Sequence, residues 1–260
     1  MFKIFPKFHN FSFFRNRQKN IQNAIKPELK FTNVSYKSNS YKILNETPVN
    51  YQNSTGYIQT TTTLIEDRPQ ALQINSIVTD DKKETIGFYE YIINKSTATI
   101  NNGYIETKSP KRGRGIGEIL RLSSIIEFME NGIKSLDIEA FPSAIPFHLK
   151  CKLKPNLTGY SQTIKILKDI NENQNVQPYY RQKAKELTEK IEQENSVILK
   201  DKTKEIVNKF IEKFIKQHLQ NWDAAKFQWY LPMSLTDSKL KQFADFYNKL
   251  FKKHGINYQI

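Results

Sequence analysis

The segment that decides the fold of this 260-residue chain reads Ser109-Pro-Lys-Arg-Gly-Arg-Gly-Ile-Gly-Glu-Ile-Leu120. Its glycines alternate with larger residues, between a run typical of a strand and a run typical of a helix. Glycine lets the backbone turn tightly and approach a ligand closely. The amides of such a turn and of the first helical turn have no intrahelical partner, so with the helix dipole they form an anion site. The segment and its basic residues Lys108, Lys111, Arg112 and Arg114 therefore predict an anion-binding loop.

Two common phosphate-binding motifs do not fit this segment. A P-loop ends in Gly-Lys-Ser or Gly-Lys-Thr, which is absent, and the dinucleotide fingerprint would need glycine in place of Glu118 or Leu120. What remains is the pattern Arg-x-x-Gly-x-Gly, which runs from Arg112 to Gly117. A flexible basic turn before a helix is the alternative reading, so the flanking sequence has to decide between them.

The flanking sequence predicts antiparallel strands upstream and a helix, strand, helix series downstream. Upstream, β-branched and alternating apolar runs are separated by short polar turns, which is typical of an antiparallel meander. The predicted strands are Tyr57–Ile65, Ala71–Val78, Thr85–Ile93 and Thr97–Thr107. Downstream we expect a helix over Ile116–Glu130, a buried strand over Lys134–Ala140 and a helix over Ser143–Leu153. The first of these helices should bury one stripe, formed by Ile116, Ile119, Leu120, Ser123, Ile126 and Met129.

In this context the glycine segment resembles the acetyl-CoA-binding motif of the GNAT N-acetyltransferase family. The run Gly132–Ala140 is similar to the family's fifth strand, and Ala144–Pro155 is similar to its fourth helix. The order and spacing match from Tyr104 to Pro155. The resemblance implies an α+β fold: a GNAT-like mixed, mostly antiparallel sheet flanked by helices, here with an added C-terminal helical region.

The resemblance also implies roles for individual residues. Amides around Arg114–Gly117 would hold the pyrophosphate of acetyl-CoA, and the fourth and fifth strands would splay apart to admit the pantetheine arm. Ile105 and Thr107 would pair with that arm through their backbone. His148 falls where many members place a tyrosine that protonates the departing thiolate; histidine can do this chemistry, but a packing histidine is the alternative. The cofactor-binding residues so implied are Ile105, Thr107, Arg112, Gly113, Arg114, Gly115, Ile116 and Gly117.

Direct transfer to an amine also needs a base, and a carboxylate commonly serves. Glu90 and Glu106, on the third and fourth predicted strands, are the candidates. For both residues the alternative is an ordinary side chain on the face of a strand. The four histidines of the chain show no metal-ligand spacing, so we predict no metal site.

The chain departs from the family pattern in three places. Lys152-Leu153 stands where the pattern has Gly-Phe, and the two helices that usually follow the first strand are not visible before Ala71. Additional helices follow the predicted core, and an aromatic run with Pro232 is compatible with an edge strand. These elements are predicted over Tyr180–Leu199, Lys202–Leu219, Phe227–Leu235 and Asp237–Lys253.

We therefore divide the chain into four parts. Residues 1–50 are predicted to be a poorly ordered basic leader, and residues 57–160 a GNAT-like acyl-CoA-binding core. Residues 161–225 are a helical insertion or extension, and residues 226–260 a possible last strand plus a C-terminal helix. The single cysteine, Cys151, rules out an internal disulfide, and with no apolar run long enough to span a bilayer we expect a cytoplasmic protein.

The function that these features favour is an acyl-CoA-dependent N-acyltransferase, with acetyl-CoA as co-substrate and an unknown amine acceptor. The net charge of +14 attracts polyanions. A non-catalytic basic nucleic-acid-binding protein is therefore an alternative, although no nucleic-acid motif supports it. A GNAT fold that binds CoA without turnover is another. Neither the acceptor nor the oligomeric state follows from the sequence.

Overall fold

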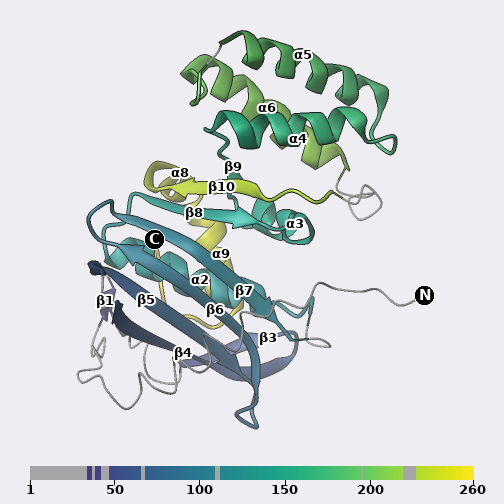
Figure 1. The fold of residues 1–260 in the computed structure, drawn as a ribbon. Helices are drawn as coiled ribbons and strands as arrows, with labels where there is room; N and C mark the ends of the chain where they lie inside the picture. The colour runs from purple at the N-terminus through teal and green to yellow at the C-terminus, as the bar shows by residue number, and fades with distance from the viewer. Residues whose placement is uncertain are drawn as a thin grey trace.

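The computed structural model describes residues 34–36, 39–41, 47–65, 68–108, 112–194, 196–218 and 227–260. Its main feature is an eight-stranded sheet with the order β3-β4-β5-β6-β7-β8-β10-β9, beside a two-stranded hairpin of β1 and β2 (Figure 1). The strands are β1 (Val34–Tyr36), β2 (Asn39–Tyr41), β3 (Thr47–Tyr51), β4 (Ser54–Ile65), β5 (Arg68–Thr79), β6 (Thr85–Asn94), β7 (Thr99–Thr107), β8 (Ser135–Ala140), β9 (Lys154–Pro155) and β10 (Leu231–Thr236). The helices are α2 (Ile116–Glu130), α3 (Ile145–Lys150), α4 (Tyr160–Glu172), α5 (Pro178–Glu194), α6 (Asp201–His218), α8 (Asp237–Gln242) and α9 (Ala244–Lys253), with a 3-10 turn η1 over Pro142–Ala144.

The sheet confirms the predicted α+β class. Every described pair of neighbouring strands is antiparallel except β7 and β8, which are parallel, so the sheet is mixed and mostly antiparallel. The four predicted strands of the meander are β4 to β7. β3 was not predicted, and it begins at Thr47, inside the range that we assigned to the leader. Residues 1–33 of that range lie outside the described residues.

β10 lies inside the sheet, between β8 and β9, and not at the edge that Pro232 led us to expect. It pairs with all of β8, from Leu231 opposite Ala140 to Thr236 opposite Ser135, but meets β9 at two positions only. The Pro232 carbonyl accepts a hydrogen bond from the Asn156 amide on the β9 side, so the missing proline N–H also faces that side. Because β9 is so short, the missing donor interrupts no ladder hydrogen bond.

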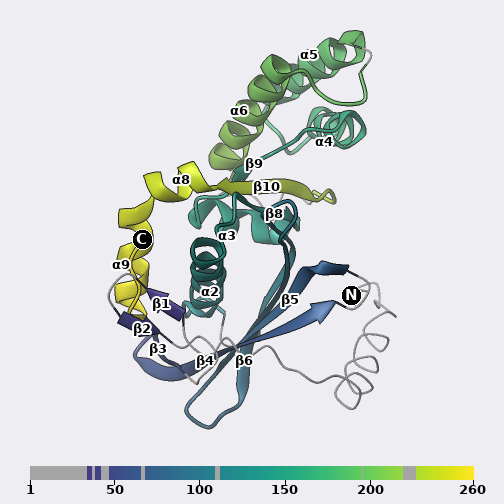
Figure 2. The same cartoon turned by 90° about the vertical axis from the view of Figure 1, so that its left-hand side faces the viewer.

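α2 packs against one face of β5, β6 and β7, with α9 on its other side (Figure 2). Its bounds are those predicted, but its burial is wider than the predicted stripe. Leu122, Ile125 and Phe128, which lie outside that stripe, are fully buried too. A helix that is covered on all sides needs apolar residues all round, and the sequence of α2 supplies them.

The three helices α4, α5 and α6 follow β9 and precede β10 in the chain. They stand together on the far side of β9 and β10 from the main sheet (Figures 1 and 2). An aromatic cluster joins two of them, since the ring of Tyr180 lies 5.5 Å from that of Phe214 and 6.0 Å from that of Phe210. The apolar face of α6 is therefore used for packing within the chain.

Two predicted helices are shorter or broken. The helix predicted over Ser143–Leu153 is a 3-10 turn followed by α3, which ends where Lys152 adopts a left-handed φ of 66°. The helix predicted over Asp237–Lys253 is divided into α8 and α9 at Phe243. The Phe243 amide donates to the carbonyls of both Lys239 and Leu240. The second of these bonds is of the 3-10 type and tightens the turn, which interrupts the helix at this point.

Candidate active site

β7 and β8 are joined only at their first residues. Thr99 pairs with Ser135 and Ile100 pairs with Leu136, and the two strands share no further register. Beyond that point β7 continues along β6 and β8 continues along β10. The edge of β7 after Ile100 therefore carries no strand partner among the described residues, and the strands separate as the splay prediction requires.

A bulge in β7 accompanies this separation. Two residues of β7, at positions 102 and 103, lie opposite the single residue Tyr91 of β6, because Glu90 pairs with Tyr104 and Ile92 with Asn101. A bulge bends its strand and increases the local twist. Gly103 is needed here, since a Cβ at this position would lie 2.5 Å from the Tyr89 hydroxyl.

The hydrogen-bond alternation of β7 shows where its backbone points. The Lys108 amide donates to the Ile86 carbonyl at 2.9 Å, so Thr107 and Ile105 occupy the positions that do not bond to β6. Their amide and carbonyl groups face the open edge. The Thr107 carbonyl accepts a hydrogen bond of 3.4 Å from Arg112 Nε, which agrees with this direction. The residues predicted to pair with a pantetheine arm thus turn their backbone groups toward the splay, where the Thr107 carbonyl meets the Arg112 side chain.

The glycine loop that follows β7 has the conformation that its sequence predicts. Gly113 and Gly115 have φ values of 80° and 94°, and Gly115 is the N-cap of α2 with no side-chain capping bond. The Gly115 carbonyl accepts from the Ile119 amide at 3.1 Å. The amides from Gly113 to Gly117 have no acceptor among the described residues. They are available to an anion at the positive end of the α2 dipole.

The loop is flanked by α3 and by the C-terminal end of α9. A Cβ on Gly115 would lie 2.8 Å from His254 Cε1, and a Cβ on Gly117 would lie 3.2 Å from the Phe147 ring. His254 and Lys253 also line a pocket of about 700 Å³ against the turn between β3 and β4. The contact of His254 with this loop could not be predicted from the sequence, because the two segments are far apart along the chain.

Glu118, in the first turn of α2, holds these flanking elements together. Its carboxylate meets His254 Nε2 at 3.0 Å, Lys253 Nζ at 2.6 Å and Lys150 Nζ at 2.7 Å. These hydrogen bonds, that of His254 first, hold the pKa of Glu118 well below its usual range against the opposing effect of burial. The cluster brings two lysines and a histidine beside the loop.

His148, on α3, lies in a buried group that the sequence did not predict. Its Nδ1 is 3.2 Å from Nη2 of Arg121, whose Nη1 donates to the Tyr89 hydroxyl at 2.9 Å. Arg121 is 1% exposed and His148 is 7% exposed. Burial, and then the charge of Arg121, keep the pKa of His148 well below its usual value, so the ring is neutral near pH 7. The signal that we missed was an arginine within the apolar sequence of α2.

The two candidate bases lie on the other face of the sheet. Tyr89 faces α2, so its neighbour Glu90 faces away, and Glu106 pairs with Phe88 on the same outer face. Burial raises the pKa of Glu90, although a hydrogen bond with Gln73 opposes the rise. Glu106 accepts a hydrogen bond from the Tyr104 hydroxyl at 3.1 Å. The structure therefore does not bring either carboxylate together with His148, because the carboxylates lie on the face of the sheet opposite α2, whereas His148 contacts Arg121 of α2.

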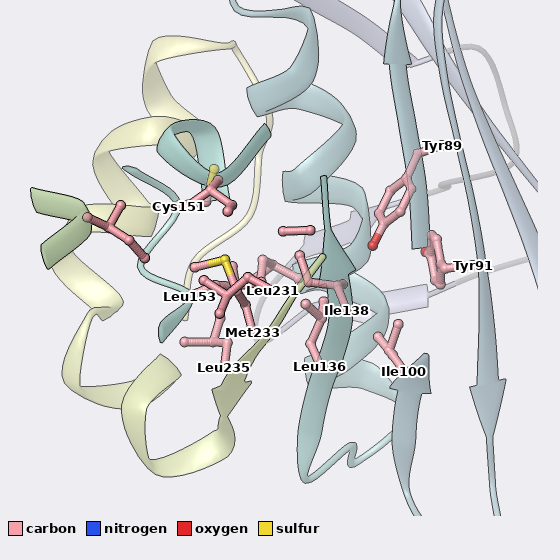
Figure 3. Packing of buried hydrophobic residues seen from close by; sticks show 14 of the residues in the cluster. Tyr89, Tyr91, Ile100, Leu136, Ile138, Cys151, Leu153, Leu231, Met233 and Leu235 are labelled. Carbon is pink, nitrogen blue, oxygen red and sulfur yellow. The ribbon is translucent and has the colours of Figure 1, made fainter. Parts of the chain in front are cut away.

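A second buried acid, Glu127, lies further along α2. It is 1% exposed, its Oε2 accepts from Asn131 Nδ2 at 2.9 Å, and its Oε1 has no hydrogen-bond partner among the described residues. Burial raises its pKa to about 7. The Tyr91 ring from β6 belongs to the same hydrophobic cluster as Leu136 and Ile138 of β8 (Figure 3).

Within the described ranges no group of three His, Cys, Asp or Glu side chains could hold a metal ion. Among the same residues, no helix has the length and apolar character that crossing a membrane requires. Cys151 is buried, and burial raises the pKa of its thiol to about 11, so it is a packing residue.

The strand order, the splay of β7 from β8 and the loop at the start of α2 together define a GNAT-type fold, which confirms the predicted resemblance. No family model matches the sequence, and no curated protein matches it. Several solved structures do match in fold, and they are GNAT acetyltransferases.

One is a chimera of the spermidine N-acetyltransferase SpeG from Vibrio cholerae and hSSAT, at 12% identity and a TM-score of 0.36, which covers 65% of this chain and 72% of that one. An acetyltransferase of the GNAT family from Staphylococcus aureus Mu50 is 14% identical with a TM-score of 0.30, and covers 32% of this chain and 54% of that one. Tetrahymena GCN5 is 18% identical with a TM-score of 0.28, and covers 30% of this chain and 49% of that one. The chain thus spans about half the length of the last two, and the likeness is one of fold.

Proposed function

We propose that this protein is an N-acyltransferase that transfers the acetyl group of acetyl-CoA directly to an amine. The observation that carries the proposal is the row of amides from Gly113 to Gly117, which heads α2 beside the open edge of β7 and for which the described part of the chain supplies no acceptor. Donors of this kind suit a diphosphate, and the neighbouring edge suits an extended amide-containing chain.

The co-substrate would be held at two places. The loop amides and the α2 dipole would hold the pyrophosphate, with Arg112 and Arg114 adding positive charge. The outward-facing backbone groups of Ile105 and Thr107 would hydrogen-bond the pantetheine arm as a further strand would, with the arm replacing the contact of Arg112 with the Thr107 carbonyl. The thioester would then lie beyond the loop, in the region where β7 and β8 separate.

In the reaction, the lone pair of the acceptor amine would form the new C–N bond, and the sulfur would leave with the electrons of the C–S bond. The amine loses one proton, and one proton ends on the sulfur. His148 is the residue proposed to serve the leaving sulfur. Because its ring is neutral, it would act by donating its ring N–H to the sulfur as negative charge develops there.

Glu90 or Glu106 would take the proton from the amine. Both lie on the face of the sheet opposite His148, so the acceptor would approach the open edge of β7 from that side. The raised pKa of Glu90 suits a base better than that of an ordinary exposed carboxylate. A carboxylate and a histidine on opposite sides of the thioester would separate proton removal from leaving-group stabilisation.

The charge of the chain bears on the acceptor. The structures similar in fold include enzymes named for spermidine, which is a polycation. A net charge of +14 disfavours the approach of a polycation and favours an acidic or polyanionic acceptor. We therefore propose an amine carried on an acidic or anionic molecule.

Thermal unfolding with acetyl-CoA, CoA and a random oligonucleotide tests the proposal. A ligand at about 100 times its dissociation constant stabilises the native state by roughly 2.7 kcal/mol, which is readily measured. We expect acetyl-CoA and CoA to raise Tm and the oligonucleotide to have no effect. The reverse result would favour the nucleic-acid-binding alternative.

A variant locates the binding to the loop. Gly115→Glu places a side chain and a negative charge among the amides, and should remove the shift with acetyl-CoA. Gly159→Glu is the matched control, because a Cβ at Gly159 meets nothing within 4 Å. Full affinity in Gly115→Glu would show that the loop assignment is wrong. Thiol release with a panel of amines then distinguishes turnover from CoA binding alone.

A further inference from the structure

A buried cation lies beneath the proposed site without a carboxylate partner. Arg121 is 1% exposed, and its hydrogen bonds go to a phenol and an imidazole. It forms no ion pair within the described residues, and its Nε has no partner there. An uncompensated charge in the interior is costly, so the presence of this arginine calls for a reason other than stability.

The hydrogen bond to His148 supplies that reason. A guanidinium only donates hydrogen bonds, so His148 Nδ1 must be the acceptor in the 3.2 Å contact with Arg121 Nη2. The single proton of the neutral ring is then on Nε2. Nε2 has no hydrogen-bond partner among the described residues, and it is therefore available as a donor.

The other titratable groups around Arg121 do not neutralise it. They are Tyr89 and Tyr91 from β6, Tyr247 from α9 and Cys151 at the end of α3. Burial raises the pKa of the Tyr91 and Tyr247 phenols and of the Cys151 thiol, so these three groups are uncharged near pH 7, and the Tyr89 hydroxyl accepts a hydrogen bond from Arg121. Glu118, one turn earlier on α2, is an anion, but its carboxylate is bonded to Lys150, Lys253 and His254. The charge of Arg121 therefore acts on the His148 ring without a carboxylate bonded to the guanidinium itself.

We propose that Arg121 is a positioning residue that fixes His148 as the neutral Nε2–H tautomer and so presents one defined N–H donor to the leaving sulfur. This inference rests on the proposed function for the identity of the group that receives the N–H. Its first part, the state of the ring, stands on the geometry of Arg121 and His148 alone.

Nitrogen-15 NMR of protein labelled at histidine tests the state of the ring. The molecule contains its own reference, because His218 Nδ1 lies 2.9 Å from the Phe214 carbonyl and must carry the proton there. We expect His148 and His218 to show opposite tautomers, and His148 to remain neutral through the range near pH 6.5 in which an ordinary histidine titrates. An Nδ1–H tautomer for His148, or its protonation within this range, would overturn the inference without any variant.

Variants then assign the effect to Arg121. Arg121→Met removes the charge and the donor at similar length, so His148 should lose its single tautomer. Its pKa should rise, although burial, the larger cause of the low value, remains. Tyr89→Phe is the control, because it disturbs the same buried group but keeps the bond from Arg121 to His148. Unchanged His148 signals in Arg121→Met would overturn the assignment, and equal changes in both variants would show a merely structural role.

Turnover gives a separate readout once an acceptor is known. Arg121→Met should lower kcat near pH 7, where its neutral His148 no longer holds the ring proton on Nε2 alone, and should leave KM for acetyl-CoA within about twofold. The deficit relative to wild type should shrink as the pH is lowered, because a protonated ring carries an N–H on both nitrogens. Failure of acetyl-CoA to raise Tm would contradict the proposed function. An Nδ1–H tautomer of His148 would contradict this inference even if acetyl-CoA binds.

Discussion

His254 Nε2 lies 3.0 Å from Glu118 Oε2, so the end of α9 is bonded directly to the first turn of α2. The opposite ring nitrogen, Nδ1, lies 2.7 Å from the Asn50 carbonyl. One imidazole thus connects β3, α2 and the C-terminal helix beside the glycine loop. The loop conformation consequently depends on contacts made by residues from three distant parts of the chain.

Glu118→Gln should destabilise the protein at pH 7 by about 2 kcal/mol, because the substitution removes a buried charge that accepts three charge-assisted hydrogen bonds. The pKa of Glu118 is lower in the folded protein than in the unfolded chain. Its contribution is therefore complete above the ordinary carboxyl pKa and is lost as pH falls below it. Urea unfolding from pH 7 to pH 3 should show the difference from wild type decreasing with pH. A difference that stays constant would contradict this origin.

Gly115→Ala should cost more stability than Gly113→Ala. Both residues have left-handed φ values, so each alanine is strained by about 1–2 kcal/mol. A methyl group at Gly115 also collides with His254, whereas one at Gly113 meets nothing within 4 Å. Adding His254→Ala should recover part of the loss in Gly115→Ala and none in Gly113→Ala. Chemical denaturation of the single and double variants measures this coupling, and additive effects would show that the contact is unimportant.

Lys152→Gly should stabilise the protein slightly, by about 0.5 kcal/mol. The residue has a φ of 66°, which glycine adopts without strain. Part of that gain is offset because the lysine Nζ lies 4.5 Å from the centre of the Phe246 ring. Lys150→Gly, inside α3, is the contrasting variant and should lower Tm. A lower Tm in Lys152→Gly would mean that the ring contact outweighs the strain.

Glu127→Gln should stabilise the protein at high pH. The pKa of Glu127 is raised to about 7, so the folded protein binds a proton that the unfolded chain has released. Wild-type stability should therefore fall as pH rises from about 4.5 to about 7, by up to about 3 kcal/mol. The variant should be close to wild type at pH 4.5 and more stable at pH 8. Glu130→Gln, at a more exposed position of the same helix, controls for the change in net charge.

The sequence predicts best the elements whose pattern is local. The meander from β4 to β7 follows from alternation and turns, and α2 follows from its glycine start and its Asn131-Gly132 stop. β3 was missed because Pro48 and Asn50 weaken its local pattern, and it is a strand only because it pairs with β4.

The glycine loop could also be predicted, because its motif is continuous in the sequence. The residues that surround it in the structure come from other parts of the chain. Glu118 and His254 are 136 positions apart, and no periodicity in either segment indicates their contact. Arg121 was missed because a helical pattern assigns positions to faces, and here both faces of the helix are covered. His148 was found only through resemblance to a family, and its partner required coordinates.

The place of β10 in the sheet has a consequence for synthesis. Until residues 231–236 leave the ribosome, β8 offers an unpaired edge next to the half-formed site, and such edges invite association with other chains. The intervening helices α4 to α6 are synthesised before β10 and can pack on one another while the edge of β8 is still unpaired. A nascent chain stalled before residue 231 should therefore be prone to aggregation. It should bind the proposed co-substrate only after the segment that carries His254 has been synthesised.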